Sequence, residues 1–82
     1  MRHVFKLIGM GWNPTREGIW FDADLYSKEE AAAQFVPVKK MSDNGPYTAY
    51  EYQGETYRYV YYLGLYEDDK MPGYTGDPEA RP

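Results

Sequence analysis

The sequence predicts an α+β fold, in which a small antiparallel sheet of about three to five strands is packed by one short helix. Two observations predict it. Short runs of β-forming side chains, separated by Gly, Pro and Asn turns, cover most of the chain. One segment combines a helix-start signal with a run of alanines. The 82 residues suffice for one domain, and we expect the order strand, strand, helix, short strand, strand, strand.

The first two strands are expected at residues 3–8 and 18–21. Both segments are rich in β-forming side chains, and the first ends at Gly9. The segment between them holds two glycines and the dipeptide Asn13-Pro14, which indicate a loop. We therefore expect these two strands to pair with each other.

The helix is predicted from its first turn. Ser27 and Glu30 have the spacing of a capping box, and three alanines with high helix propensity follow. Pro37 ends the run, because the residue before a proline disfavours the α conformation. We expect the helix to span residues 28–36. A helix this short needs a packing partner, and three side chains are expected to dock it on the sheet: Ala32, Phe35 and Val36.

Two further strand signals follow the helix. Residues 38–41 are expected to form a short edge strand, on which Lys39 and Lys40 hinder edge-to-edge aggregation. Residues 42–46, with the sequence Ser-Asp-Asn-Gly-Pro, predict a turn. A long Tyr-rich hairpin is then expected over residues 47–66, with its turn at Gln53-Gly54.

The register of this hairpin decides which tyrosines share a face. A two-residue or a four-residue loop pairs Tyr52 with Glu55 and Tyr50 with Tyr57, whereas a three-residue loop would mix the two faces. In the first register one face carries Tyr50, Tyr52, Tyr57, Tyr59 and Tyr61. The other carries Tyr47, Ala49, Glu51, Thr56, Arg58, Val60 and Tyr62. Because aliphatic residues are scarce, we expect the first face to be core, which leaves Tyr47 and Tyr62 as exposed anchors.

Composition excludes several classes of protein. The chain has no Cys and a single His, so a disulfide scaffold and a Cys-ligated metal site are impossible. We find no signal-peptide or membrane-span pattern and expect a cytoplasmic protein. Residues 1–68 are expected to form the single domain, and the Pro/Gly-rich residues 69–82 a flexible C-terminal tail.

No residue set predicts catalysis or cofactor binding. Asp22 and Asp24 lack the further ligands of a calcium loop. Gly9-Met10-Gly11 lacks the third glycine and the following helix of a phosphate-binding fingerprint. The serines are expected to serve as a cap and a turn residue, and no His–acid pair has a useful spacing. We therefore expect a non-enzymatic protein with no metal and no cofactor.

Charge is the main functional signal. The chain carries 9 Lys+Arg and 13 Asp+Glu, a net charge of −4, and residues 41–82 alone hold three basic and eight acidic side chains. Such a surface repels duplex nucleic acid and complements a basic groove on a protein partner. The side chains expected to bind this partner are Glu51, Glu55, Glu67, Asp68, Asp69, Tyr47 and Tyr62.

In layout the chain resembles the small acidic inhibitors that phages encode, anti-CRISPR proteins in particular. The likeness rests on a short chain without Cys, a capped helix from Ser27 to Val36, a Tyr-rich hairpin and an acidic second half. It implies a stoichiometric inhibitor in the host cytoplasm that occupies the nucleic-acid channel of a nuclease or CRISPR effector complex. We expect a monomer or weak homodimer that binds neither membranes nor duplex nucleic acid.

Two alternatives belong to other classes. One is a single-stranded nucleic-acid-binding module that stacks bases on exposed tyrosines. The other is a small structural or assembly subunit that self-associates through a strand edge or a sheet face.

Overall fold

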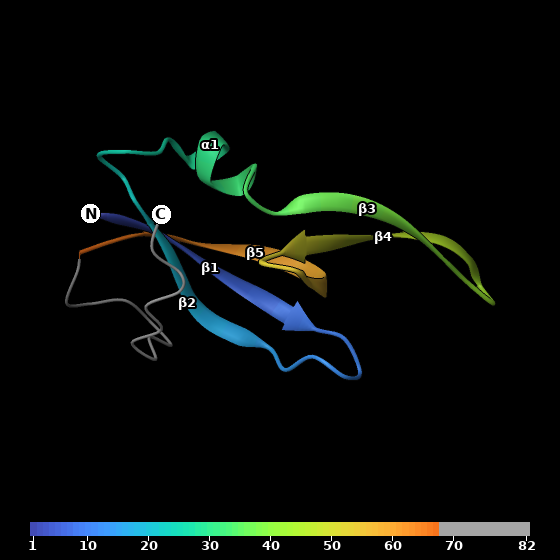
Figure 1. Cartoon of the computed structure of the whole chain (residues 1–82). Coiled ribbons are helices and arrows are strands. Elements are labelled where there is room, and N and C mark those ends of the chain that lie inside the picture. The colour runs from blue at the N-terminus through green and yellow to red at the C-terminus, as the bar shows by residue number, and fades with distance from the viewer. Residues whose placement is uncertain (68–82) are drawn as a thin grey trace.

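The protein is a five-stranded antiparallel sheet with one short helix, as a computed structural model describes it for residues 1–67 (Figure 1). The strands lie side by side in the order β2-β1-β5-β4-β3. The elements, in chain order, are β1 (Arg2–Gly9), β2 (Arg16–Asp22), α1 (Lys28–Ala32), β3 (Val36–Ser42), β4 (Gly45–Tyr52) and β5 (Glu55–Tyr66). The predicted tail, residues 69–82, lies outside the described residues. Within residues 1–67 no helix is long and apolar enough to cross a membrane.

The predicted α+β class is wrong, because the described chain is mostly β. The helix α1 begins as expected, with the Ser27 capping box formed in both directions, but it has five residues and buries only Ala31. Val36, which precedes Pro37, already belongs to β3, since a residue before proline favours extended backbone. Of the three predicted docking residues, Phe35 is buried while Ala32 and Val36 are exposed. A helix of this size does not form a layer.

The core lies in the part of the sheet formed by β1, β2 and β5, which with α1 we call the body. Phe5, Leu7, Ile19 and Val4 are fully buried there. On the side of α1, Phe35 lies 5.0 Å from Phe5 between ring centroids and 4.9 Å from Tyr52. Such tilted and edge-on aromatic contacts are favourable beyond the area that they bury. We call the side of the sheet under α1 the covered face and the opposite side the outer face.

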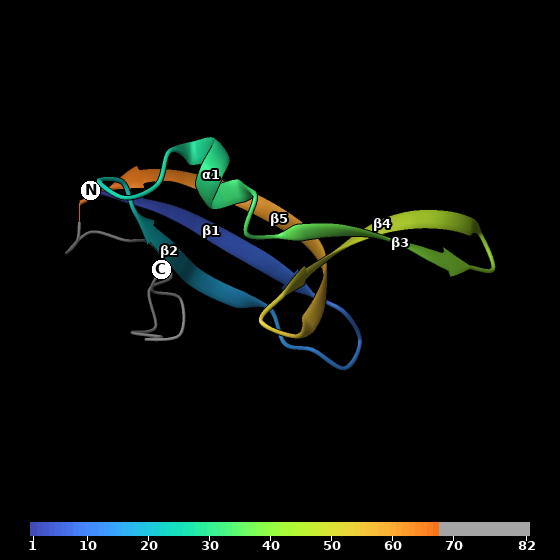
Figure 2. The same cartoon turned by 45° about the horizontal axis from the view of Figure 1, so that its top comes forward.

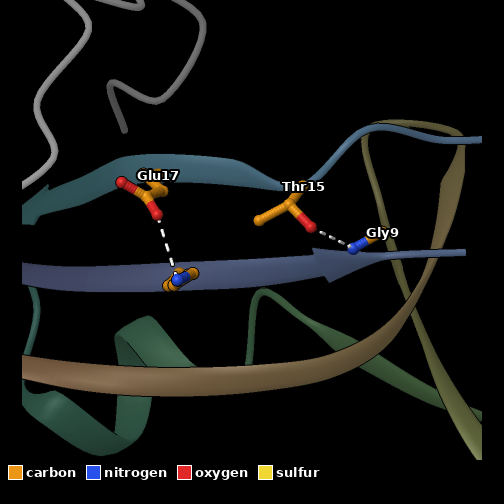
Figure 3. Close-up of polar contacts among 4 residues, drawn as sticks. Gly9, Thr15 and Glu17 are labelled. Carbon is orange, nitrogen blue, oxygen red and sulfur yellow. Dashed lines mark hydrogen bonds and ion pairs between the residues drawn. The ribbon is translucent and has the colours of Figure 1, made fainter.

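The loop between β1 and β2 is anchored at both ends. The backbone N–H of Gly9 donates to the hydroxyl of Thr15 over 3.0 Å (Figure 3). The amide of Asn13 donates to the carbonyl of Thr56 over 2.7 Å, so the loop is held against the start of β5. A Cβ atom on Gly9 would come within 1.9 Å of the Asn13 carbonyl oxygen. The loop therefore closes only with glycine at this position.

The hairpin β3–β4 projects beyond the body as a two-stranded arm (Figures 1 and 2). It pairs along its whole length, from Val36↔Glu51 to Ser42↔Gly45. In contrast, β4 pairs with β5 only from Tyr50↔Tyr57 to Tyr52↔Glu55. The rest of β4 therefore has a neighbour on one side only. We define the arm as residues 38–49.

The predicted register of the Tyr-rich hairpin is confirmed near its turn. Tyr52 faces Glu55 and Tyr50 faces Tyr57. Gln53 and Gly54 both have positive φ, 51° and 80°, as a type I′ two-residue turn requires. The hairpin is not formed by β4 and β5 over its full length, however, because the pairing of Thr48 with Tyr59 is absent from the ladder.

A β-bulge then overturns the predicted faces of β5. Ile8 pairs with Tyr59 but the next residue, Gly9, pairs with Tyr57, so Arg58 is one extra residue. Because side chains alternate with a period of two, one extra residue exchanges the faces beyond it. Tyr59 and Tyr61 therefore leave the predicted core face and lie exposed on the outer face. Val60 and Tyr62 take their place and pack against the core.

Candidate interaction surface

The outer face presents a pair of tyrosines at its centre. Tyr59 and Tyr61 project from β5, and their cross-strand partners on β1 are Ile8 and Lys6. The two tyrosines are 52% and 51% exposed. Their ring centroids lie 6.2 Å apart, with 36° between the ring planes. Two rigid rings held side by side on a strand form a preorganised contact surface.

An ion pair borders the tyrosines on the side of β2. Lys6 Nζ lies 3.0 Å from Glu17 Oε1, and both side chains are partly exposed (Figure 3). A pair this exposed adds little stability. It does hold the ammonium group of Lys6 on the same face as Tyr61, the cross-strand partner of Lys6.

The far end of the outer face is closed by packing. Trp20, the cross-strand partner of Val4, is only 8% exposed. The guanidinium carbon of Arg2 lies 3.8 Å from the Trp20 ring centroid, a cation–π contact that shields the ring. The indole Nε1 of Trp20 is buried and has no hydrogen-bond partner among residues 1–67. This end of the face offers less accessible aromatic surface than the end at Tyr59.

A pocket of about 380 Å³ lies between the arm, from its tip to Thr48, and the start of β5. This volume is at the small end of the range for ligand sites. The residues that line it come from the arm and from the start of β5: Ser42, Asn44, Tyr47, Thr48, Arg58 and Tyr59. No carboxylate is among them, and Arg58 has no ion-pair or hydrogen-bond partner within residues 1–67. The pocket is therefore suited to an anionic group.

The predicted binding residues are distributed over three places. Tyr47 lines the pocket. Glu51 and Glu55 are exposed near the β4–β5 turn, where they pair with Thr56 and Tyr52. Glu67 is exposed beyond the opposite end of β5, roughly 30–40 Å of strand away. Asp68 and Asp69 lie outside the described residues. The structure therefore does not bring the predicted carboxylates together into one patch.

Tyr62, expected as an exposed anchor, makes contacts inside the protein. Its ring centroid lies 5.2 Å from that of Phe5, and its hydroxyl lies 2.9 Å from His3 Nδ1. His3 Nε2 lies 3.1 Å from the carbonyl oxygen of Tyr26. Since a carbonyl only accepts, Nε2 carries the proton, and in the neutral ring Nδ1 accepts from Tyr62. Burial, followed by the charge of Glu29, raises the pKa of Tyr62 above 10.0. The only histidine is thus a structural link between β1 and the loop before α1.

Residues 1–67 hold no metal-binding cluster, and both of their serines have structural roles. Residues 1–67 contain no cluster of three or more His, Asp or Glu side chains that could hold a metal ion. Ser27 accepts from the Glu30 amide as a helix cap, and Ser42 Oγ donates to the Gly45 carbonyl in the β3–β4 turn. The described chain offers exposed aromatic rings and cations on a sheet face, an arrangement that suits binding.

Tyr59 and Tyr61 are the surface residues that the sequence pattern misassigned. The alternation of the hairpin placed both tyrosines in the core, since nothing in the pattern marks Arg58 as a bulge. One signal was present in the sequence. The strand has few aliphatic residues, namely Val60, Leu63 and Leu65. Placing Val60 inward, as its side chain favours, places Tyr59 and Tyr61 outward.

Comparison with known proteins gives no family for this chain. No protein-family model matches the sequence, and neither the curated proteins nor the solved structures include a significant match.

Proposed function

We propose that this chain is a non-enzymatic protein-binding module that contacts its partner with the outer face of the sheet. The observation that carries the proposal is the exposed Tyr59–Tyr61 pair at the centre of that face. Exposed aromatic surface of this kind marks interaction sites. Tyrosine and arginine dominate the binding energy of protein interfaces, and Arg58 lies next to Tyr59 on the same strand. Rings fixed on a strand lose little conformational freedom when a partner binds.

The more specific form of the proposal is inhibition of a host nucleic-acid-handling complex, as for phage-encoded inhibitors. The net charge of −4 supports it, because an acidic protein is attracted to a groove that binds nucleic acid. Two separate carboxylate groups are candidates to contact such a groove. One is Glu51 with Glu55, and the other begins at Glu67 and continues in the sequence with Asp68 and Asp69.

The test of the general proposal is an affinity capture with cross-linking from host lysate. The double variant Tyr59→Ala, Tyr61→Ala should lose the captured partner. The variant Leu25→Ala should keep it, since Leu25 is another exposed apolar residue, 69% accessible, in the loop before α1. A partner that the tyrosine variant still captures at the wild-type yield contradicts the proposal.

The inhibitor form is tested by charge reversal of each carboxylate group. Glu51→Lys with Glu55→Lys, or the triple reversal at Glu67, Asp68 and Asp69, should weaken partner binding and reduce its salt dependence. If neither set changes the affinity or the salt dependence, the electrostatic mechanism is wrong.

A second candidate function, binding of single-stranded nucleic acid, is favoured by one observation. Exposed tyrosine rings lie beside cationic side chains: Lys6 lies opposite Tyr61 on the neighbouring strand β1, and Arg58 directly precedes Tyr59. Rings with adjacent cations stack unpaired bases and contact phosphates. Fluorescence anisotropy with labelled oligo(dT) at low salt decides this candidate. Salt-sensitive binding that Tyr59→Ala abolishes supports it, and no binding at low salt removes it.

A further inference from the structure

The pocket beside the arm adjoins the place where β4 and β5 stop pairing. If the β4–β5 ladder continued beyond Tyr50↔Tyr57, the next opposed residue pairs would be Ala49 with Arg58 and Thr48 with Tyr59. Neither pair forms. The pocket is instead lined by Thr48 from β4 and by Arg58 and Tyr59 from β5. Ser42, Asn44 and Tyr47 complete its lining, so the pocket extends from the unpaired edges of β4 and β5 along the arm towards its tip.

Backbone groups of Thr48 point into the gap between the unpaired edges of β4 and β5. In a hairpin with a two-residue turn, the residues flanking the turn form a hydrogen-bonded pair, and the direction then alternates along the strand. Tyr52 flanks the turn, so Tyr52, Tyr50 and Thr48 direct their backbone groups towards β5. Tyr52 and Tyr50 meet their partners there. Thr48 is not part of any residue pair between β4 and β5 within residues 1–67.

Each edge of the arm carries a proline, and the inner edge keeps one donor beside the pocket. The same alternation places Pro37 with its ring nitrogen towards the outer edge of β3, where Lys39 also lies. Proline and lysine are the residues that keep edge strands from pairing. On the inner edge of β4, Pro46 removes the donor nearest the tip. Thr48 is then the first donor beside the pocket that no proline removes, and the carbonyl group of an added strand can accept from it.

Charge selects the kind of chain that this edge would accept. Arg58 borders the gap without a partner of its own in the described part of the chain. Lys39 and Lys40 lie on the neighbouring strand, opposite Thr48 and Tyr47. Asp43, in the turn at the tip, is the one carboxylate of residues 38–49. The arm base is thus a basic site on an acidic protein.

We propose that an extended, acidic segment of the partner protein adds as a strand in the gap between β4 and β5. Its backbone pairs with Thr48, and one of its carboxylates pairs with Arg58. The tyrosines Tyr47 and Tyr59 flank this carboxylate. The inference rests on the proposed protein-binding function and names the chemistry of the partner.

The experiment uses the full chain and a fluorescein-labelled ten-residue peptide that alternates Glu and Thr, with a Lys/Thr peptide for comparison. Fluorescence anisotropy should show salt-sensitive binding of the acidic peptide only. Thr48→Pro, which deletes the N–H group, should weaken binding about tenfold or more. Arg58→Glu should weaken it by at least as much. Circular dichroism confirms that each variant is folded.

Two matched variants separate the backbone group from other effects. Thr48→Ala keeps the N–H group and changes only the side chain, so it should bind the acidic peptide more tightly than Thr48→Pro. Met41→Pro deletes an N–H group at the outer edge of the same arm, and Met41 is 75% exposed, so this variant should bind normally. Equal binding by Thr48→Pro and the wild type, or no binding of the acidic peptide at all, overturns the inference.

Other occupants give different results, and each overturns the inference. Oligo(dT) binding that is lost in Arg58→Glu but kept in Thr48→Pro assigns the gap to nucleic acid. A wild-type dimer in light scattering that Thr48→Pro dissociates assigns it to a second copy of the chain. If a captured partner is lost with the Tyr59 and Tyr61 substitutions but kept with Thr48→Pro, the protein-binding function stands and strand addition falls.

Discussion

The strands β1 and β3 have nearly the same length and opposite environments. In β1, with eight residues, half of the side chains are buried, whereas β3, with seven, has none buried. Both contain apolar residues: β1 has Val4 and Phe5, and β3 has Val36 and Met41. The difference is position, because β1 lies in the body, whereas most of β3 projects beyond it in the arm (Figure 1). The same alternation therefore builds a core in the body and an accessible surface in the arm.

The largest loss of stability is expected for a substitution in the body. Phe5→Ala removes a ring that contacts Phe21, Phe35 and Tyr62, and loss of a buried Phe costs about 3–5 kcal/mol. That is a large part of the stability of so small a domain. Met41→Ala on the arm should change the free energy of unfolding by less than about 0.5 kcal/mol. Urea denaturation followed by circular dichroism measures both, and equal losses would show that the arm is part of the core.

A smaller effect is expected at the loop that closes the body. Gly9→Ala places a Cβ against the backbone of Asn13 and Pro14, and overpacking of this kind costs about 1–3 kcal/mol. Gly11→Ala is the control in the same loop, because a Cβ there meets no atom within 4 Å. The urea midpoint should fall for Gly9→Ala only. A midpoint that falls equally for Gly11→Ala would mean that flexibility of the loop, and not close approach at Gly9, sets the stability.

The smallest effect is expected at the cap of α1, the short helix of the body. Ser27→Ala removes one bond of the capping box, which is worth about 1 kcal/mol. The Ser27 backbone N–H donates to Glu30 over 2.9 Å. This bond, then the Ser27 side chain, lowers the pKa of Glu30 below 4.5. A lowered pKa means that the bonds stabilise the fold above pH 4.5, and that this contribution is lost as the pH falls through the folded pKa.

NMR titration of the Glu30 side chain checks this sign. The midpoint should lie below 4.5 in the wild type and rise towards 4.5 in Ser27→Ala. The resonances of the arm should not follow this titration, because α1 covers the body. A wild-type midpoint at or above 4.5 contradicts the capping argument.

The sequence predicted the local structure better than the layers. The start of the helix, the turn at Gln53-Gly54 and the first two strands were identified, because each depends on neighbouring residues. The end of the helix was not, since the preference of Val36 for extended backbone prevailed over the alanine run. The fold class failed with it, because a helix of five residues cannot form a layer.

The contact surface was predicted only in part, for a reason of the same kind. Tyr47 was expected at the surface and lines the pocket. Tyr62 was expected there too and instead bonds His3. The assignment failed beyond Arg58, because a bulge is fixed by the register between β1 and β5 and not by local sequence. Partners far apart in the sequence decide such a register.

The extra residue at Arg58 shifts the alternation of side chains along β5 by one position. If Arg58 were paired in register instead of bulging, the alternation would continue unbroken past it, and Tyr59 and Tyr61 would turn inward while Val60 and Tyr62 turned outward. No side chain needs to change for the inside and the outside of the protein to be exchanged along this stretch. The side chains that the outer face presents to a partner thus depend on the position of the bulge as much as on the tyrosines themselves.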